Sequence, residues 1–520
     1  MDNGNRRQLR LAELIAPLSL ATDLGLGQPM EQALRTCLLS VALGRQIGLA
    51  DDCLSDTYYL ALLRFIGCTS DAHEQSLGVG GDEIAFFAGV APILMGDTSE
   101  ALGYFLRHLA EDQPLPVRAR LVTSALAGGK RDMLRMIAIH CEVAQMLAGQ
   151  LGLRPTIADG IRHLYERWDG TGLPVGLAGE AIPIQVRIAV IARDIDILYR
   201  IGGWPLVVER LHKRRAKAYD PDLVDVALIE GQQWVADLDS GTTWDAVLES
   251  EPAAQLTVPE SDLDGVLGAF ADFADIKTPF TAGHSRGVAD LAAQAARICG
   301  LPGQDITDIR HAALVHDLGR VGVPNGIWEQ PGPLSDVAWE RVRLHPYFSE
   351  RMLHRSRPLR CLAPLAGAHH ERLDGSGYHR GSPAAQLSIA QRILAAADCY
   401  QAMTQPRPHR PAMRAAMAAT ELRQEVESGR LDRDAANAVL EAAGFARAAS
   451  RRSWPAGLTD REVEVLRLIC RGESNRIVAA QLSISPKTVG RHIENLYNKI
   501  GVSSRAAATL FATRHHLLDI

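Results

Sequence analysis

The feature that most constrains the fold of this 520-residue chain is a repeat between its first half and its middle. Residues 62–67, Leu-Leu-Arg-Phe-Ile-Gly, have the pattern of residues 314–319, Leu-Val-His-Asp-Leu-Gly, and each follows a Gly-Leu pair at the same interval. Farther on, Glu-Arg-Trp-Asp-Gly-Thr-Gly at 166–172 matches Glu-Arg-Leu-Asp-Gly-Ser-Gly at 371–377. Self-similarity of this kind predicts two copies of one domain.

The histidines that precede the second pair of motifs keep the same register. His140 and His345 each stand 26 residues before the glutamate that opens the motif. The first copy carries an insertion between Gly67 and His140. Ala and Leu dominate, aromatic residues make up only 5%, and apolar positions recur near helical spacing, which favours helix over sheet. We therefore expect an all-α fold with two tandem helical domains.

The second copy contains histidines and aspartates in an order that suits a metal centre. Imidazole and carboxylate ligands together favour a hard-to-borderline divalent cation, and the absence of thiolates argues against structural zinc. A helical domain could fold the recurring residues together, whereas a single histidine would be an ordinary polar residue. The candidate ligands are His284, His316, Asp317, His345, His369, His370 and Asp398.

This order, with its intervening glycines, resembles the HD-GYP family of metal-dependent phosphodiesterases over roughly residues 284–444. The resemblance implies two divalent metal ions, with iron or manganese expected, and Asp317 as the carboxylate that bridges them. It also implies catalytic roles for Asp317 and Arg320. The expected ligand is a phosphorylated nucleotide, cyclic di-GMP being one candidate. The implied substrate-binding residues are Arg320, Asp374, Gly375, Gly377 and Tyr378.

Three positions depart from the family pattern. Arg320 replaces the usual lysine, His379 replaces the proline of Gly-Tyr-Pro, and Gln401 replaces an aspartate. Arginine holds a phosphate oxygen well but is a poorer proton donor than lysine. A site that binds metal without turnover is therefore an alternative. Residues 371–377 could also be only a tight turn, because Asp-Gly-Ser-Gly is turn chemistry and the first copy keeps it.

The first copy has lost most of the candidate ligands. Only His140 remains in register, and Asp194 stands for Asp398 one residue out of step. We expect this copy to hold no catalytic metal and to serve packing, dimerisation or ligand sensing, the alternative being a relocated metal site. The residues at the other ligand positions are Gln32, Arg64, Phe65, Leu164 and Tyr165.

The last stretch of the chain predicts a helix-turn-helix. Thr459 and Glu462 form a capping box, Ser474 is expected to cap a short second helix, and Ser485-Pro486 begins a third helix that Gly501 ends. This stretch resembles the LuxR-type DNA-binding domain, which has four helices. The alternative is a helical protein-interaction domain. The predicted DNA-binding residues are Lys487, Thr488, Val489, Arg491 and His492.

The expected organisation follows from these motifs and from composition. Acidic and proline-rich residues predict one linker, and a basic stretch predicts another. Eight cysteines without a close pair, no signal peptide and no long apolar run predict a cytoplasmic protein that does not contact membranes. The expected segments are a degenerate HD-GYP-like domain (1–240), a linker (241–262), an HD-GYP-like domain (263–445), a linker (446–456) and the LuxR-type domain (457–520).

These expectations define a DNA-binding transcriptional regulator, acting on duplex DNA as a homodimer, whose central domain hydrolyses or senses a cyclic dinucleotide. Two alternatives remain open. One is primarily an enzyme that its DNA-binding tail localises. The other is a non-catalytic transcription factor whose HD-like domains serve dimerisation or ligand sensing. The net charge of −6 excludes a chain that coats nucleic acid along its whole surface.

Overall fold

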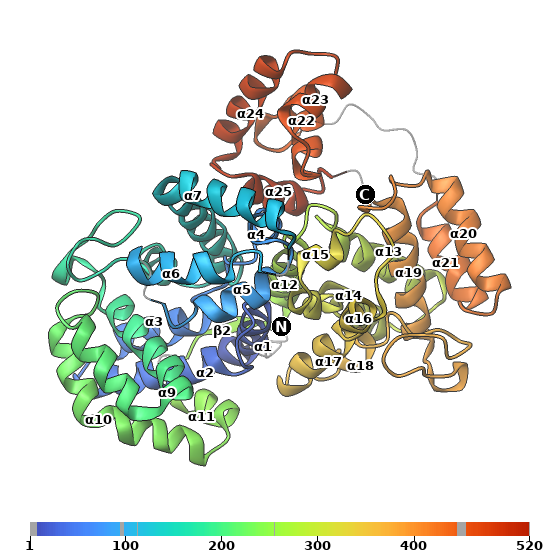
Figure 1. The fold of residues 1–520 in the computed structure, drawn as a ribbon. Helices are drawn as coiled ribbons and strands as arrows, with labels where there is room; N and C mark the ends of the chain where they lie inside the picture. Colours follow the sequence, from blue (N-terminus) through green and yellow to red (C-terminus); the bar gives the residue numbers. More distant parts are fainter. Residues whose placement is uncertain (1–7, 94–97, 112, 254, 445–453, 519–520) are drawn as a thin grey trace. The chain divides into compact units, whose positions relative to one another are not determined.

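Helices form nearly all of the regular structure of the protein, as the sequence predicted (Figure 1). The computed structural model describes residues 8–93, 98–111, 113–253, 255–444 and 454–518. The chain divides into two compact units, Met1–Leu263 and Asp264–Ile520. Within the described residues, no helix is both long and apolar enough to cross a lipid bilayer.

The core of the first unit lies between α2 and α9, with α3 and α10 packed beside them. Leu39 and Leu43 of α2 meet Ile188 and Ile191 of α9 in one buried cluster. The elements of this unit are β1 (Gln8–Arg10), α1 (Leu11–Gly25), α2 (Gln32–Gln46), α3 (Asp51–Leu63), α4 (Ala72–Val79), α5 (Glu83–Val90), α6 (Thr98–His108), α7 (Leu115–Gln150), α8 (Pro155–Ile161), η1 (Gly179–Ala181), α9 (Ile184–Arg214), α10 (Pro221–Ser240), α11 (Thr243–Ser250), β2 (Thr257–Pro259) and η2 (Glu260–Asp262).

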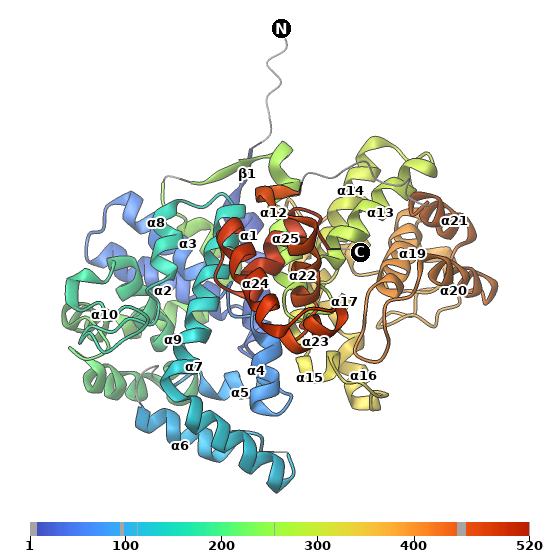
Figure 2. The ribbon, with the colours of Figure 1, turned by 90° about the horizontal axis from the view of Figure 1, so that it is seen from above.

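The segment 241–262 belongs to the first unit, so the prediction of a linker there was wrong. It contains α11 and the strand β2, which pairs antiparallel with β1 in the register Leu9 to Val258 (Figure 2). The buried carboxylate of Glu251 accepts hydrogen bonds from Arg10 at 2.6 Å and from the Tyr59 hydroxyl at 2.5 Å. The acidic and proline-rich composition therefore did not indicate that polar groups of this segment pair with residues far away in the sequence.

The second unit is built around α13, which packs against α14, α19 and α21. Its elements before the C-terminal region are α12 (Leu263–Asp275), α13 (His284–Ile298), α14 (Gly303–Val315), η3 (Leu318–Gly322), α15 (Asn325–Trp328), α16 (Asp336–Arg343), α17 (His345–Arg355), α18 (Ala363–Ala366), η4 (Ala384–Gln386), α19 (Ile389–Thr404), α20 (Ala415–Glu427) and α21 (Arg433–Ala442). The predicted linker 446–456 lies mostly outside the described residues, which resume at Trp454.

Close approaches of the backbone repeat in the two units. A Cβ added to Gly67 would lie 2.0 Å from the carbonyl oxygen of His140, and one added to Gly319 would lie 2.1 Å from that of His345. Only glycine allows such contact, so the glycine of each motif is required for packing. This conserved geometry supports the predicted duplication.

The motif loops also have the same internal bonds. Glu166 accepts the backbone N–H groups of residues 175–177, and Glu371 accepts those of Arg380 and Ser382. Three residues after each glutamate, an aspartate is bonded in the same way. Asp169 accepts the backbone N–H and the hydroxyl of Thr171, and Asp374 accepts those of Ser376. The loop is therefore a structural feature of the domain, which explains why the first copy kept it.

The C-terminal region forms the predicted helix-turn-helix from α22 (Asp460–Cys470), α23 (Asn475–Gln481), α24 (Pro486–Ile500) and α25 (Arg505–Arg514), preceded by η5 (Pro455–Gly457). Thr459 and Glu462 form the expected capping box, and Ser485 accepts from the Thr488 N–H. Gly501 ends α24 in the left-handed conformation, with φ of 71°. Ser474 precedes α23 without a side-chain capping bond, contrary to expectation.

Candidate metal centre and DNA-binding surface

The candidate ligands project from the ends of helices rather than from one surface. His284 and His345 are the first residues of α13 and α17, His316 and Asp317 directly follow α14, and His369 and His370 follow α18. Asp398 alone lies inside a helix, α19. All seven side chains converge in the second unit, as the ligand order predicted.

Backbone carbonyl groups fix the orientation of three of the histidines. The Nδ1 atoms of His316, His345 and His369 lie 2.7, 2.6 and 2.6 Å from carbonyl oxygens three residues earlier in the chain. Because a carbonyl can only accept, Nδ1 donates a proton to it and Nε2 is the ring nitrogen that faces the centre. His284 obtains the same orientation from the side chain of Gln405, whose Oε1 lies 2.8 Å from its Nδ1.

The donor atoms form two groups. One contains His345, His369 and His370, and the other contains His284, His316 and Asp398, while a third set of His316, Asp317 and His369 links the two. Within each group the possible ligand atoms all lie within 4.8 Å of one another. Each group is therefore compact enough for its members to share a single cation.

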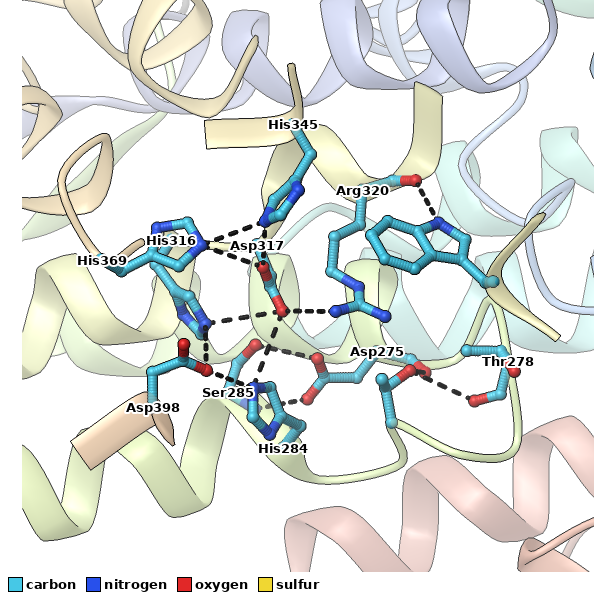
Figure 3. A network of polar contacts seen from close by, with 12 residues as sticks. Asp275, Thr278, His284, Ser285, His316, Asp317, Arg320, His345, His369 and Asp398 are labelled. Carbon is cyan, nitrogen blue, oxygen red and sulfur yellow. Dashed lines mark hydrogen bonds and ion pairs between the residues drawn. The ribbon is translucent and has the colours of Figure 1, made fainter. Parts of the chain in front are cut away.

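Asp317 lies between the two groups (Figure 3). Its Oδ1 is 3.3 Å from Nε2 of His345 and 3.5 Å from Nε2 of His369. Its Oδ2 is 3.5 Å from Nε2 of His316 and 3.7 Å from Nε2 of His284. One carboxylate thus presents one oxygen to each group, which is the geometry of a bridging ligand.

The charges of the centre depend on one another. Burial by itself would raise the pKa of Asp317, but His316, Arg320 and the neighbouring imidazoles outweigh it and hold the pKa well below its ordinary range. Burial likewise lowers the pKa of His316, while Asp317 and Asp398 raise it to about 9. A bound cation would compete with that proton, since ligand imidazoles must be neutral.

The residues present fit a divalent cation. In the part of the chain that the structure describes, Nε2 of His316 and Oδ1 of Asp317 are buried without a hydrogen-bond partner. Unsatisfied buried polar atoms are costly, so their convergence indicates a missing partner for both. Nitrogen and oxygen donors without thiolates suit the harder transition metals.

Arg320 lies beside the centre, as predicted. Its Nη1 is 3.3 Å from Oδ2 of Asp317, and its guanidinium carbon lies 3.9 Å from the centre of the Trp328 ring. The indole N–H of Trp328 donates to the carbonyl oxygen of Arg320. Stacking on the ring fixes the guanidinium plane, so the donors next to the carboxylate are held in place.

Two groups near the centre were missed by sequence reasoning. Arg407 is partly buried and close enough for the charges of Arg320 and Asp398 to act on it, and desolvation together with Arg320 lowers its pKa to about 10. Asp275 accepts from both the N–H and the hydroxyl of Ser285, each at 2.8 Å, and burial raises its pKa to about 7. The aspartate lies in an ordinary apolar helix, and the arginine in a proline-rich stretch, so neither carried a sequence signal.

Of the other predicted substrate-binding residues, Tyr378 lies against the centre. Its ring is 4.3 Å from that of His370, at an interplanar angle of 32°. Asp374 is exposed, and its carboxylate accepts the backbone N–H of Ser376. Gly375 has a positive φ of 77°. A Cβ added to Gly377 would lie 2.6 Å from Cα of Glu371. These three shape the loop, and their contact with substrate stays a prediction.

The departures from the family pattern have different surroundings. Gln401 is buried one turn after Asp398. His379 packs near Tyr347, with 5.9 Å between ring centres, and within the described residues neither of its ring nitrogens has a hydrogen-bond partner. His379 is therefore a partly exposed side chain whose ring nitrogens are shielded from solvent.

In the first unit, ion pairs occupy the place of the metal centre. Asp194 accepts from Arg193 at 2.6 Å and from Arg214 at 2.9 Å, and also from the Tyr219 hydroxyl. His140 is bonded to Asp71 at 2.6 Å. Among the described residues of this unit, no three His, Cys, Asp or Glu side chains gather as metal ligands do. The guanidinium groups of Arg193 and Arg214 thus pair with the Asp194 carboxylate, which is then not available as a metal ligand.

We expect the exchange of His140 for glutamine to leave the metal content of the full-length protein unchanged. His140 is the ligand position that the first copy kept, but its Nε2 is already occupied by Asp71. Elemental analysis of wild type and variant, purified side by side, measures this. A fall in the metal-to-protein ratio in a variant that elutes normally from gel filtration would contradict the prediction.

The predicted DNA-binding residues fall on both faces of α24. Lys487, Thr488 and Arg491 are exposed, and His492 is partly exposed. Val489 has 0% exposure and packs in the hydrophobic core of the C-terminal region, so its prediction as a DNA contact was wrong. Its position, two residues from Lys487 and from Arg491, places it on the opposite side of the helix. In the last turn of α24, Lys499 forms an ion pair with Glu462, with 2.7 Å between its Nζ and Oε2 of the glutamate.

Two known families match the chain. Residues 129–223 and 268–435 match the family described as "HD domain", so both copies of the repeat are recognised. Residues 456–512 match "Bacterial regulatory proteins, luxR family". The chain therefore belongs to the HD-domain family and carries a LuxR-type domain, which confirms both resemblances.

Similar proteins are cyclic dinucleotide phosphodiesterases. The 3'3'-cGAMP-specific phosphodiesterase 3 of Vibrio cholerae is 32% identical over 409 residues, which cover 78% of this chain and 88% of that protein. A cyclic di-GMP phosphodiesterase of Thermotoga maritima is 34% identical over 147 residues, covering 28% of this chain and 39% of that protein. A crystal structure of a cyclic GMP-AMP-specific phosphodiesterase from V. cholerae superposes with a TM-score of 0.60 at 28% identity, covering 85% of this chain and 99% of that one.

Proposed function

We propose that the protein is a cyclic dinucleotide phosphodiesterase that uses two divalent metal ions, iron or manganese, and acts as a DNA-binding transcriptional regulator. The position of Asp317, with one oxygen toward each group of three ligands, carries the proposal. Similarity to enzymes named for cyclic di-GMP and 3'3'-cGAMP supports the class of substrate.

In this proposal His345, His369 and His370 would hold one ion, His284, His316 and Asp398 would hold the other, and Asp317 would offer one carboxylate oxygen to each. A pair of such ions supplies Lewis acidity and an activated water for in-line attack on a phosphodiester. Arg320 holds a non-bridging phosphate oxygen through the guanidinium that Trp328 orients. The shielded position of the ligands keeps bulk water from competing with the substrate.

The proposal is tested by incubating the full-length protein, made under iron- or manganese-replete and low-oxygen conditions, with cyclic di-GMP and with 3'3'-cGAMP. Hydrolysis is followed by chromatography of the nucleotide products, and metal content is measured on the same sample. We expect about two metal ions per chain and turnover of at least one substrate. A protein that contains metal but hydrolyses neither substrate contradicts the enzymatic proposal.

The LuxR-type domain adds binding to duplex DNA through the exposed start of α24. Lys487, Thr488, Arg491 and His492 are the proposed contacts, and a homodimer is the proposed binding form. Such a pair would place two recognition helices on two half-sites of the operator.

The alternative, a regulator that senses the nucleotide without consuming it, is supported by Arg320 and Gln401, which replace residues of the family pattern. If the central site regulates DNA binding, saturating cyclic dinucleotide is expected to change operator affinity in wild type. A ligand shifts such an equilibrium only by its differential affinity for the two arrangements, and the effect is reciprocal. Fluorescence anisotropy of an operator duplex measures it, with a catalytically blocked variant to prevent hydrolysis. Equal affinity with and without nucleotide contradicts coupling.

A further inference from the structure

Helix α16 exposes a large aromatic side chain next to the candidate metal centre. Ala338 and Val342 form its buried face, whereas Trp339 is 39% exposed and Val337 is 75% exposed. Tyr347, just beyond the helix, is also 39% exposed.

A line of ring contacts joins Trp339 to the ligands. The Trp339 ring is 6.4 Å from that of Tyr378, which it meets edge to face. Tyr378 in turn lies 4.3 Å from the ring of His370 and 6.1 Å from that of His345. The exposed indole is therefore separated from two candidate metal ligands by a single aromatic side chain.

This spacing suits a nucleotide whose phosphate lies at the metals. In a nucleotide one sugar separates the base from its phosphate, so a base-binding surface should lie one side chain away from the phosphate site. Indole offers a broad face for stacking, and every nucleobase has a face that can stack on it. Arg343, one turn after Trp339 on the same side of α16, is close enough for its charge to act on Tyr378, and its Nη1 is paired with Glu340 at 2.8 Å.

We propose that Trp339 is the stacking surface for a nucleobase of the cyclic dinucleotide. The inference rests on the proposed function and deepens it, because it assigns recognition of the base to α16 while the metals and Arg320 recognise the phosphate. Stacking tolerates different bases, so Trp339 contributes to affinity for guanine- and adenine-containing dinucleotides alike.

The test compares full-length wild type with Trp339→Ala, Trp339→Phe and Val337→Ala. Val337→Ala is the matched control, because it removes an exposed apolar side chain from the same helix two residues away. Isothermal titration measures binding of cyclic di-GMP, of 3'3'-cGAMP and of inorganic phosphate, and elemental analysis measures metal content. Light scattering reports the oligomeric state of each variant.

We expect Trp339→Ala to weaken both dinucleotides by about tenfold or more, the usual consequence of losing an aromatic stacking partner. Phosphate binding and metal content should stay at the wild-type level, and Trp339→Phe should restore most of the affinity. Unchanged dinucleotide binding by Trp339→Ala overturns the inference, and if that variant is also a smaller oligomer, the patch is a contact between copies of the chain. If wild type itself binds neither dinucleotide, the proposed function fails first and the inference fails with it.

Discussion

Exchange of Asp317 for asparagine is expected to reduce cyclic dinucleotide hydrolysis by more than about 100-fold, because changes to groups that merely support a ligand already cost about 10- to 100-fold. Asparagine preserves the size of the side chain but replaces one oxygen with an NH₂ group and removes the negative charge. One of the two ligand groups then faces a donor instead of an acceptor. We expect the loss of at least one metal ion per chain.

Asp305→Asn provides the control for this experiment. Asp305 is an exposed carboxylate in the first turn of α14, the same helix whose end carries His316 and Asp317. Its exchange should leave metal content and hydrolysis unchanged. If Asp317→Asn keeps the full metal content and the wild-type rate, Asp317 is not a bridging ligand and the two-metal site is wrong.

Removal of Lys487 and Arg491 together is expected to weaken binding to duplex DNA strongly. Both side chains are exposed at the start of α24, where a recognition helix meets the major groove. For a residue that contacts only phosphate, its loss lowers the slope of log affinity against log salt by about one. For one that reads a base edge, its loss costs about 1–3 kcal/mol and relaxes sequence preference at that position.

Anisotropy titrations at several salt concentrations, with each single variant and the double variant, distinguish these two roles. Arg433→Ala is the matched control, since Arg433 is an exposed arginine on α21, outside the C-terminal region. It should bind DNA as wild type does. Affinity of the double variant equal to that of the control, at moderate salt, would show that α24 is not the recognition helix.

The helix-turn-helix was predicted almost completely because its signals are local. Capping residues, Pro486 and Gly501 act on neighbouring backbone groups, and the structure places them as expected. The prediction failed for Val489, because the exposed and buried sides of a helix depend on what packs against it. The convergence of the candidate metal ligands was predictable for another reason: their order along the chain resembles a known family.

Residues that act through long-range contacts could not be predicted. Arg407 and Trp328 reach the centre only through the folded positions of α19 and α15, and nothing in their neighbours along the chain marks them. The segment 241–262 has a linker-like composition, but Glu251 there pairs with Arg10 from the opposite end of the unit. The composition of a segment carries no information about partners, such as Arg10, that lie far away in the sequence.

The pairing of β1 with β2 has a consequence for how the protein folds during synthesis. Leu9 has its strand partner at Val258, so nearly the whole first unit must leave the ribosome before the pair can form. Contacts between residues so distant in sequence are slow to form, because the intervening chain must first be ordered. By the time β2 has left the ribosome and can pair, translation of the second unit, which starts near Leu263, is already under way. Since domains generally fold as units from the N-terminal side, the first unit is expected to be complete before the second, which contains the candidate metal centre, has folded.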